Sequence, residues 1–254
     1  MSSTEPAHPL QEAAAPPPAE ARWDERALSI LTAEHASLAS ARALAYNEAF
    51  TRIGNYLSFL SISFVVLALI AQATSFDEPF LGIAAITLTF DFVIGLITLG
   101  RILGTTSDDL RTVQAMARVR HGYLQIAPHL EPYFSDGTTD DREGVMLSYR
   151  VPESGLRGVL YALTTSTGMT VIIVALLGGV LAGVLAMFVG VGAELAFGLG
   201  TASTVVIFAV AGAAAGRYFV RDQAGLEVRF PSAQAAPLPE GPPERGGGPR
   251  PGPT

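Results

Sequence analysis

The chain contains neither cysteine nor lysine. Its 254 residues include 16 cationic side chains, and all of them are arginine. The absence of cysteine excludes disulfides, thiolate catalysis and cysteine-ligated metals. Charged residues make up only 15% of the chain, less than is usual for a soluble protein of this length. The formal net charge of −7 argues against a nucleic-acid partner, which would favour a basic patch.

Long apolar runs dominate the rest of the sequence. They occupy residues 56–74, 80–100, 163–189 and 195–216. Each is long enough for a helix to cross a hydrocarbon core of ~30 Å, which takes roughly 20 residues. The runs are continuously apolar, whereas the strands of a barrel would alternate. The sequence therefore predicts an all-α membrane protein with four transmembrane helices arranged as two hairpins.

The arginines predict how the chain is threaded. Four precede the first span, seven lie between the second and third, and five follow the fourth. The connections at 75–79 and 190–194 hold none and carry the acidic residues Asp77, Glu78 and Glu194. By the positive-inside rule, both termini and residues 101–160 are expected to be cytoplasmic, in a bacterial plasma membrane. Residues 1–27 lack the apolar stretch of a signal peptide, so the first span is expected to direct insertion.

Two cytoplasmic helices are expected beside the spans. Residues 24–55 are Ala-rich, with Asp24 placed as an N-cap, and lead into the first span. Residues 107–127 form the second helix, which Ser107 caps and Pro128 ends. Its apolar residues recur at helical spacing: Leu110, Val113, Met116, Ala117, Tyr123 and Leu124. This apolar face either packs on the first helix in a small bundle, which we favour, or the Arg-bearing helix lies on anionic lipid.

The remaining segments are expected to lack regular structure. Residues 135–153 contain an acidic cluster formed by Asp136, Asp140, Asp141 and Glu143. Counted from the first of these aspartates, a calcium loop needs Gly at the sixth position and Glu at the twelfth, where Asp141 and Leu147 stand. A solvated acidic loop is therefore predicted. Residues 1–23 and most of 217–254 are rich in Pro, Ala and Gly and are expected to be disordered.

Two segments resemble a group of actinobacterial multi-pass integral membrane proteins. The first is Leu31-Thr32-Ala33-Glu34-His35-Ala36-Ser37-Leu38, with Asn47-Glu48-Ala49-Phe50 and Ala71-Gln72-Ala73-Thr74 after it. The second is Met116-Ala117-Arg118-Val119-Arg120-His121-Gly122-Tyr123-Leu124, followed by Pro128-His129-Leu130-Glu131-Pro132-Tyr133-Phe134. The resemblance covers residues 28–134 and is looser through the last two spans. It implies membrane location and architecture, and no activity is established for that group.

Asp91 is the only ionisable residue well inside an apolar run. A charge at that depth costs about 3 kcal/mol on insertion scales. Arg101 is ~15 Å further along a helix axis, too far for an ordinary ion pair. The carboxyl group is therefore expected to be protonated and hydrogen-bonded to Thr87 or to Ser or Thr of a neighbouring span. The alternatives are a role in proton or cation handling, or contact with a lipid or ligand.

Small residues mark the second hairpin. Gly179 and Gly183 form one GxxxG motif, and Gly212 and Gly216 form another. This spacing lets helix backbones approach closely, so we expect packing between the third and fourth spans or between protomers.

No catalytic, cofactor or metal-binding motif stands out. His35, His121 and His129 lack metal-ligand spacing, and no phosphate-binding or hydrolase motif occurs. The leading hypothesis is a non-enzymatic plasma-membrane protein that associates with lipid, with a second copy or with another membrane protein. The alternative is a small proton or cation channel or transporter that uses Asp91, and an enzyme ranks third.

Overall fold

Helices form nearly the whole of the computed structural model. It describes residues 19–75, 77–150 and 155–232, so most of the two tails lies outside the described residues. The helices are α1 Ala19–Thr74, α2 Glu78–Ile126, the 3-10 helix η1 Pro128–Tyr133, α3 Arg142–Tyr149, α4 Leu156–Thr164, α5 Ser166–Phe188 and α6 Ala193–Ala224. No strand occurs in the described ranges. The predicted all-α class is confirmed.

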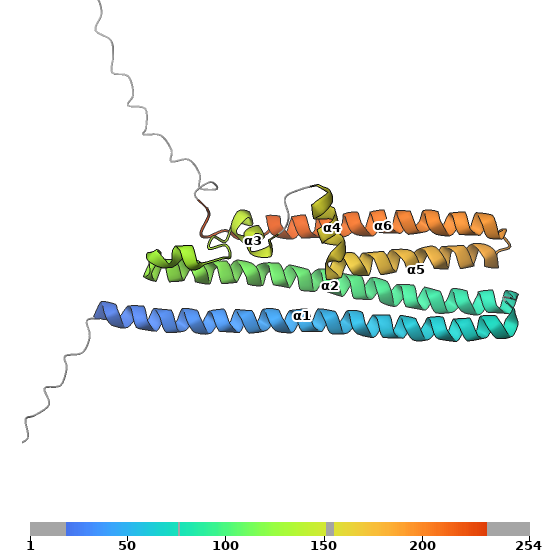
Figure 1. Ribbon diagram of the computed structural model, residues 1–254, viewed down its shortest axis with the longest axis horizontal. Helices are drawn as coiled ribbons and strands as arrows, with labels where there is room; N and C mark the ends of the chain where they lie inside the picture. The colour runs from blue at the N-terminus through green and yellow to red at the C-terminus, as the bar shows by residue number, and fades with distance from the viewer. Residues whose placement is uncertain (1–18, 76, 151–154, 233–254) are drawn as a thin grey trace, which may run out of the picture.

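Two very long helices set the shape of the molecule. α1 has 56 residues and α2 has 49, and the two run antiparallel along its whole length (Figure 1). At ~1.5 Å per residue they measure roughly 84 Å and 74 Å. Because a hydrocarbon core is only ~30 Å thick, more than half of each helix must lie outside one. The α5–α6 hairpin lies beside α2, over the half nearer the α1–α2 turn.

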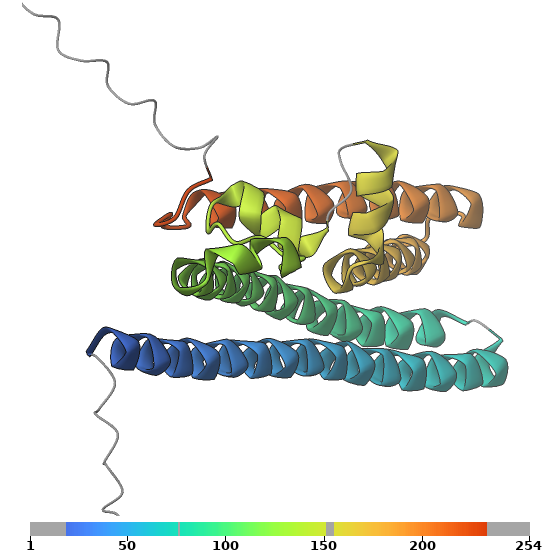
Figure 2. The same ribbon diagram turned by 60° about the vertical axis from the view of Figure 1, so that its left-hand side comes forward.

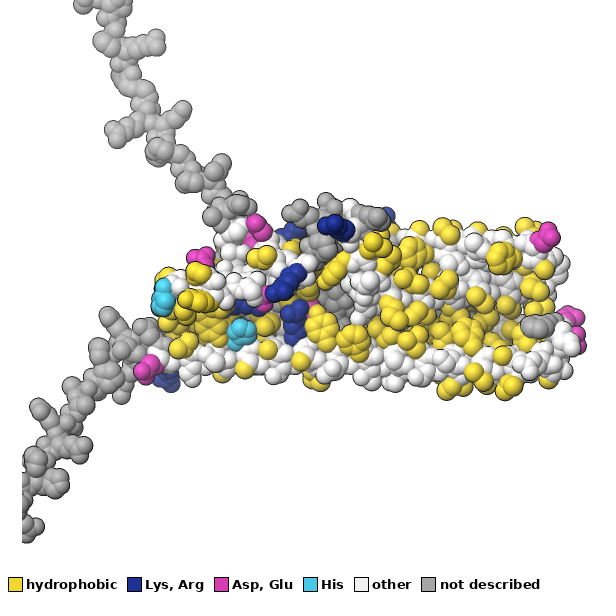
Figure 3. Space-filling model, viewed as in Figure 1, with side chains coloured by type: hydrophobic (Ala, Val, Ile, Leu, Met, Phe, Trp, Pro, Cys, Tyr) yellow, Lys and Arg dark blue, Asp and Glu magenta, His cyan; other side chains and the backbone are white. Residues whose placement is uncertain are grey.

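α1, α2, α5 and α6 are each long and apolar enough to cross a membrane. The turns that join α1 to α2 and α5 to α6 lie at the same end of the molecule (Figure 1). On the face shown in Figure 3, apolar side chains cover the half of the molecule that contains the two hairpin turns, while arginines and histidines gather on the other half. We call these the apolar half and the polar half; α3, η1 and the residues after α6 belong to the polar half.

The helix boundaries differ from the sequence expectation in the first hairpin. α1 begins at Ala19, so Asp24 lies inside the helix. α2 continues without a break through Ser107, which therefore does not begin a separate helix. Gly100 and Gly104 do not interrupt it, because a glycine costs a helix only about 1 kcal/mol. Packing against α1 offsets that cost.

The boundaries of the second hairpin also differ. The expected third span began at residue 163, but Leu163 belongs to α4. Thr165 has extended backbone and caps α5 by accepting a hydrogen bond from the Gly168 N–H at 3.1 Å. α6 continues past the expected end at Gly216 as far as Ala224. Of the following residues, which were expected to be mostly disordered, Leu226 and Phe230 pack against α2 and Ser232 bonds to Asp141 before α3.

Residues 135–153, expected to be a loop, contain the short helix α3. Asp141 caps it by accepting a hydrogen bond from the Gly144 N–H at 3.0 Å. A buried apolar cluster of Leu110, Val113 and Val145 joins α2 to α3, with Phe219 and Leu226 packed against it. The apolar face of residues 107–127 is therefore covered in part by α3 and by the end of α6.

Glycines determine the contact between α5 and α6. A Cβ on Gly179 would lie 2.7 Å from the carbonyl oxygen of Gly200, and a Cβ on Gly183 would lie 3.4 Å from that of Ala196. The first GxxxG motif therefore packs as predicted, and its partner is Gly200. Among the described residues, nothing lies within 4 Å of a Cβ built on Gly212 or Gly216. This second motif therefore does not pack against the third span, and its packing between protomers stays a prediction.

Candidate functional site

Asp91 is buried between α1 and α2. Its side chain is 0% exposed, and the Ser63 hydroxyl of α1 donates a hydrogen bond to Asp91 Oδ1 at 3.0 Å. The partner is thus a hydroxyl of the neighbouring span and not Thr87. Asp91 Oδ2 and the Tyr56 hydroxyl have no hydrogen-bond partner among the described residues. A Cβ on Gly95, one turn from Asp91, would lie 2.5 Å from the Tyr56 oxygen, so this hydroxyl lies on the α2 backbone close to the carboxyl group.

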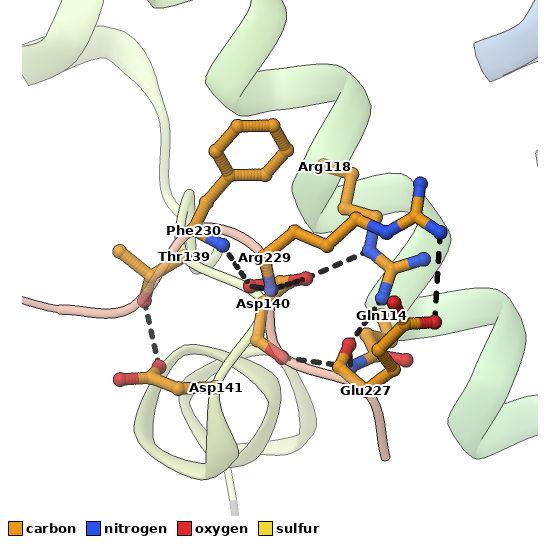
Figure 4. A network of polar contacts seen from close by, with 8 residues as sticks. All are labelled: Gln114, Arg118, Thr139, Asp140, Asp141, Glu227, Arg229 and Phe230. Carbon is orange, nitrogen blue, oxygen red and sulfur yellow. Dashed lines mark hydrogen bonds and ion pairs between the residues drawn. The ribbon is translucent and has the colours of Figure 1, made fainter. Parts of the chain in front are cut away.

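A second buried carboxylate, Asp140, joins three segments of the polar half (Figure 4). Its side chain is 0% exposed and accepts a hydrogen bond from Arg118 Nε of α2 at 2.7 Å. The backbone N–H groups of Arg229 and Phe230 donate to it at 2.9 Å and 2.7 Å. Residues 225–232, which we call the C-terminal segment, are thereby fixed to α2 and to the loop before α3.

Neighbouring groups complete this joint. Gln114 Nε2 donates to the carbonyl oxygens of Asp140 at 2.9 Å and Glu227 at 3.0 Å. Asp141 accepts a hydrogen bond from the Ser232 N–H at 2.9 Å. Burial alone would raise the pKa of Asp141, but hydrogen bonds from Ser232 and its other partners lower it to about 2.

The prediction of a solvated acidic loop is therefore wrong. Asp140 and Asp141 are buried, and Asp136 pairs with Arg120 at 3.0 Å, which leaves Glu143 as the exposed member of the cluster. Burial alone would raise the pKa of Asp140, but the bonds from the Arg118 guanidinium and two backbone N–H groups lower it. The acidic residues are a structural joint, because their partners come from distant parts of the chain.

A third polar network lies closer to the apolar half. Asp109 of α2 accepts hydrogen bonds from Arg42 Nε at 2.8 Å, the Tyr46 hydroxyl at 3.2 Å and the Tyr149 hydroxyl at 2.6 Å. Burial raises the pKa of Tyr149, and the negative charge of Asp109 raises it further. For Arg42, the hydrogen bond and charge of Asp109 outweigh burial and raise the pKa. Arg42 therefore stays charged and both tyrosines stay protonated, tying α1, α2 and α3 together.

A cavity of about 560 Å³ adjoins the Asp109 network. Five helices and Tyr149 form its wall, and the helices are α1, α2, α4, α5 and α6. Its apolar part includes Ala49, Ile102, Leu103, Val171 and Phe208. Its polar part includes Tyr46, Thr106, Ser107, Asp109, Tyr161, Thr164, Thr165, Ser166, Thr167 and Asp222. The cavity is thus apolar toward the spans and rich in hydroxyl groups toward the polar half.

The two glycines of the second GxxxG motif lie at this cavity. Gly212 and Gly216 line the cavity, together with Ala215 between them. Small side chains on this face of α6 leave space that a larger residue would fill. The second GxxxG motif therefore opens a cavity within the chain.

The histidines take part in packing. His35 stacks on Tyr123 with ring centroids 5.8 Å apart, and His121 stacks on Phe230 at 4.3 Å. Burial lowers the pKa of His35, and the charge of Arg120 lowers it further. Among the described residues, no group of three or more His, Cys, Asp or Glu is placed to hold a metal ion.

No protein-family model, curated protein or solved structure matches the chain. The resemblance to actinobacterial membrane proteins therefore stays a prediction, and the geometry alone has to support a function. The cavity was missed by sequence reasoning. Two signals point toward it: the hydroxyl run at residues 164–167, where α4 ends and the apolar helix α5 begins, and the presence of Asp222 on the same helix as Gly212.

Proposed function

We propose that this protein is an integral membrane protein of the bacterial plasma membrane that acts by association and not by catalysis. Its main partner is lipid at the cytoplasmic surface of the membrane. α1, α2, α5 and α6 are the spans, the hairpin turns face outward, and the polar half projects into the cytoplasm with both termini. The observation that carries this proposal is the position of α4 beside the cavity.

α4 has the features of a helix that lies in a membrane surface. It runs across the axes of α5 and α6 where the spans meet the polar half (Figures 1 and 2). Val159 and Leu160 are 57% and 53% exposed, and Arg157 beside them is also exposed. An apolar face with cationic residues at its edge is typical of helices in the headgroup region. α4 also lines the cavity, through residues that include Gly158, Tyr161 and Ala162.

Spin labels at single cysteines test this placement, because the chain contains no other cysteine. Leu160→Cys on α4 is compared with Leu147→Cys on α3, and these leucines are 53% and 58% exposed. In lipid nanodiscs, the label at 160 should be relaxed by oxygen, which concentrates in lipid, and be protected from a water-soluble nickel chelate. The label at 147 should show the opposite pattern. Equal nickel accessibility at both positions would refute the lipid contact of α4.

A transport function is the second candidate, and one observation favours it. Asp91 Oδ2 and the Tyr56 hydroxyl are buried polar atoms without a hydrogen-bond partner among the described residues. Burying a polar atom without a partner inside a membrane costs free energy, and residues that do so often belong to functional sites. In proteoliposomes with an imposed pH gradient, a transporter would move protons or cations, and Asp91→Asn would abolish that flux. We expect no flux above empty liposomes, because Asp91 is fully buried and does not line the cavity.

A further inference from the structure

We infer that the cavity binds an uncharged lipid whose headgroup carries free hydroxyl groups, such as a diacylglycerol. This inference rests on the proposed association with lipid and specifies the lipid. It is carried by the extent of the cavity, the charges at its wall and the hydrogen-bonding capacity of its hydroxyl groups.

The cavity has the extent and polarity gradient that an amphiphile requires. Along α6 its wall runs from Phe208 in the apolar half to Asp222 in the polar half. This separation corresponds to about 21 Å at ~1.5 Å per residue. A volume of about 560 Å³ lies within the roughly 300–1,000 Å³ of small-molecule sites. A headgroup at the Asp222 end would leave an acyl chain beside Val171 and Phe208.

The charges at the wall favour an uncharged ligand. No arginine occurs among the described residues that line the cavity, so nothing there would neutralise a phosphate. Each lining carboxylate already faces a cation outside the wall. Asp109 pairs with Arg42 at 2.8 Å, and Asp222 lies 3.6 Å from Arg111. A cationic ligand would therefore compete with these arginines, whereas a neutral one would not.

The hydroxyl groups at the wall favour a ligand that donates hydrogen bonds. Thr164 and Tyr161 donate their protons to the carbonyl oxygens of Tyr161 and Tyr149. Ser107 donates its proton to Asp222. A hydroxyl group that has given its proton away still has lone pairs that accept. The polar groups of this mainly apolar wall are therefore mostly acceptors, and ligand hydroxyl groups supply the donors that match them.

A photoactivatable diacylglycerol, with a diazirine in one acyl chain, tests the proposal. The full chain is placed in phosphatidylcholine nanodiscs that contain the probe, irradiated, and digested for mass spectrometry. We expect adducts in residues 158–171 and 208–222, which line the cavity from α4, α5 and α6. Adducts spread evenly over the outer faces of the four spans would overturn the inference.

A cavity-filling variant gives the decisive comparison. Gly212→Leu places its Cβ in open space, because nothing lies within 4 Å of it, and the rest of the leucine side chain reduces the cavity. Gly198→Leu is the matched control, because Gly198 is also open, is on the same helix and does not line the cavity. We expect the first variant to lose about ten-fold of the cavity adducts and the second to keep them. Equal labelling of both folded variants would refute the site.

Competition identifies the chemistry. Unlabelled diacylglycerol should reduce labelling, whereas phosphatidylglycerol and free glycerol at the same concentration should not. Competition by phosphatidylglycerol would overturn the requirement for an uncharged headgroup. Competition by glycerol would show a polyol site and not a lipid site. The spin-label test separates this inference from the proposed function. Lipid contact at Leu160 without adducts in the cavity would refute only the lipid site. Water contact at Leu160 would refute the proposed lipid contact of α4.

Discussion

Replacing Asp140 with alanine should loosen the C-terminal segment while leaving the four long apolar helices intact. Asp140 accepts hydrogen bonds from Arg118 and from the backbone N–H groups of Arg229 and Phe230, and it is fully buried. Alanine removes all three bonds at once. The two N–H groups then have to find water, because Asp140 is their only acceptor among the described residues.

The magnitude follows from the number and kind of these bonds. A hydrogen bond to a charged group contributes about 1.5–3 kcal/mol, so three bonds set an upper limit near 9 kcal/mol. The cost is smaller, because the Arg118 side chain is 26% exposed and can turn toward water. The freed N–H groups are also at the protein surface once the segment leaves. We expect a loss of about 3 kcal/mol in the local free energy of opening, which is roughly a hundred-fold.

Hydrogen exchange measured by mass spectrometry checks this prediction on the purified full chain. Peptides that contain Arg229 and Phe230 should lose about a hundred-fold of their protection in Asp140→Ala, while peptides from α5 should be unchanged. Glu143→Ala is the control, because Glu143 is exposed and its contact with the Ser232 hydroxyl is long at 3.4 Å. Its effect should stay within about 0.5 kcal/mol. Unchanged protection in Asp140→Ala would refute the role assigned to this carboxylate.

Acid should reproduce the effect of the variant. The pKa of Asp140 is lowered and that of Asp141 is lowered to about 2, so both carboxylates stabilise the folded state when ionised. Their contribution is complete above the unfolded-state pKa of about 3.9 and is lost as the pH falls through the folded-state pKa. Protection of the C-terminal segment, corrected for intrinsic exchange, should be flat near neutral pH and should fall between about pH 4 and 2. A loss already complete at pH 5 would contradict these lowered values.

Two further variants test the apolar half. Gly179→Ala should destabilise the α5–α6 pair by about 1–3 kcal/mol, because the new Cβ would lie 2.7 Å from the Gly200 oxygen. The control Gly198→Ala should be neutral or gain up to about 1 kcal/mol of helix propensity. Equal stability of the two variants in thermal unfolding in detergent would contradict the packing. Asp91→Asn should keep the native melting temperature, because an amide oxygen can still accept a hydrogen bond from Ser63. Asp91→Leu should lose about 1 kcal/mol of stability. A large drop in the melting temperature of Asp91→Asn would show that the carboxyl group itself is required.

Several features could be predicted from the sequence because they depend on local composition. Four helices long and apolar enough to span a membrane follow from the lengths of the apolar runs, since lipid requires each span to satisfy its own backbone. The contact that Gly179 and Gly183 make with α6 also follows from sequence, because small residues at this spacing permit close approach on one helix face. The burial of Asp91 beside a hydroxyl group of the neighbouring helix could also be anticipated, because an isolated carboxylate inside an apolar helix requires a partner.

Other features were decided only by the tertiary structure. Ser107, Asp108 and Asp109 look like the start of a helix, yet α2 passes through them, because capping preferences of about 1 kcal/mol are weak against a long packed interface. The residues Asp140 and Asp141 look like part of a solvated loop, because no local pattern reveals that Arg118 and the backbone of the C-terminal segment will surround them. The cavity depends on the meeting of α1, α2, α4, α5 and α6 and the last residue of α3, and an open glycine has the same sequence signature as a packed one. Length and hydropathy are properties of one segment, so sequence determines them; burial of charge and empty space are properties of several segments, so only their packing does.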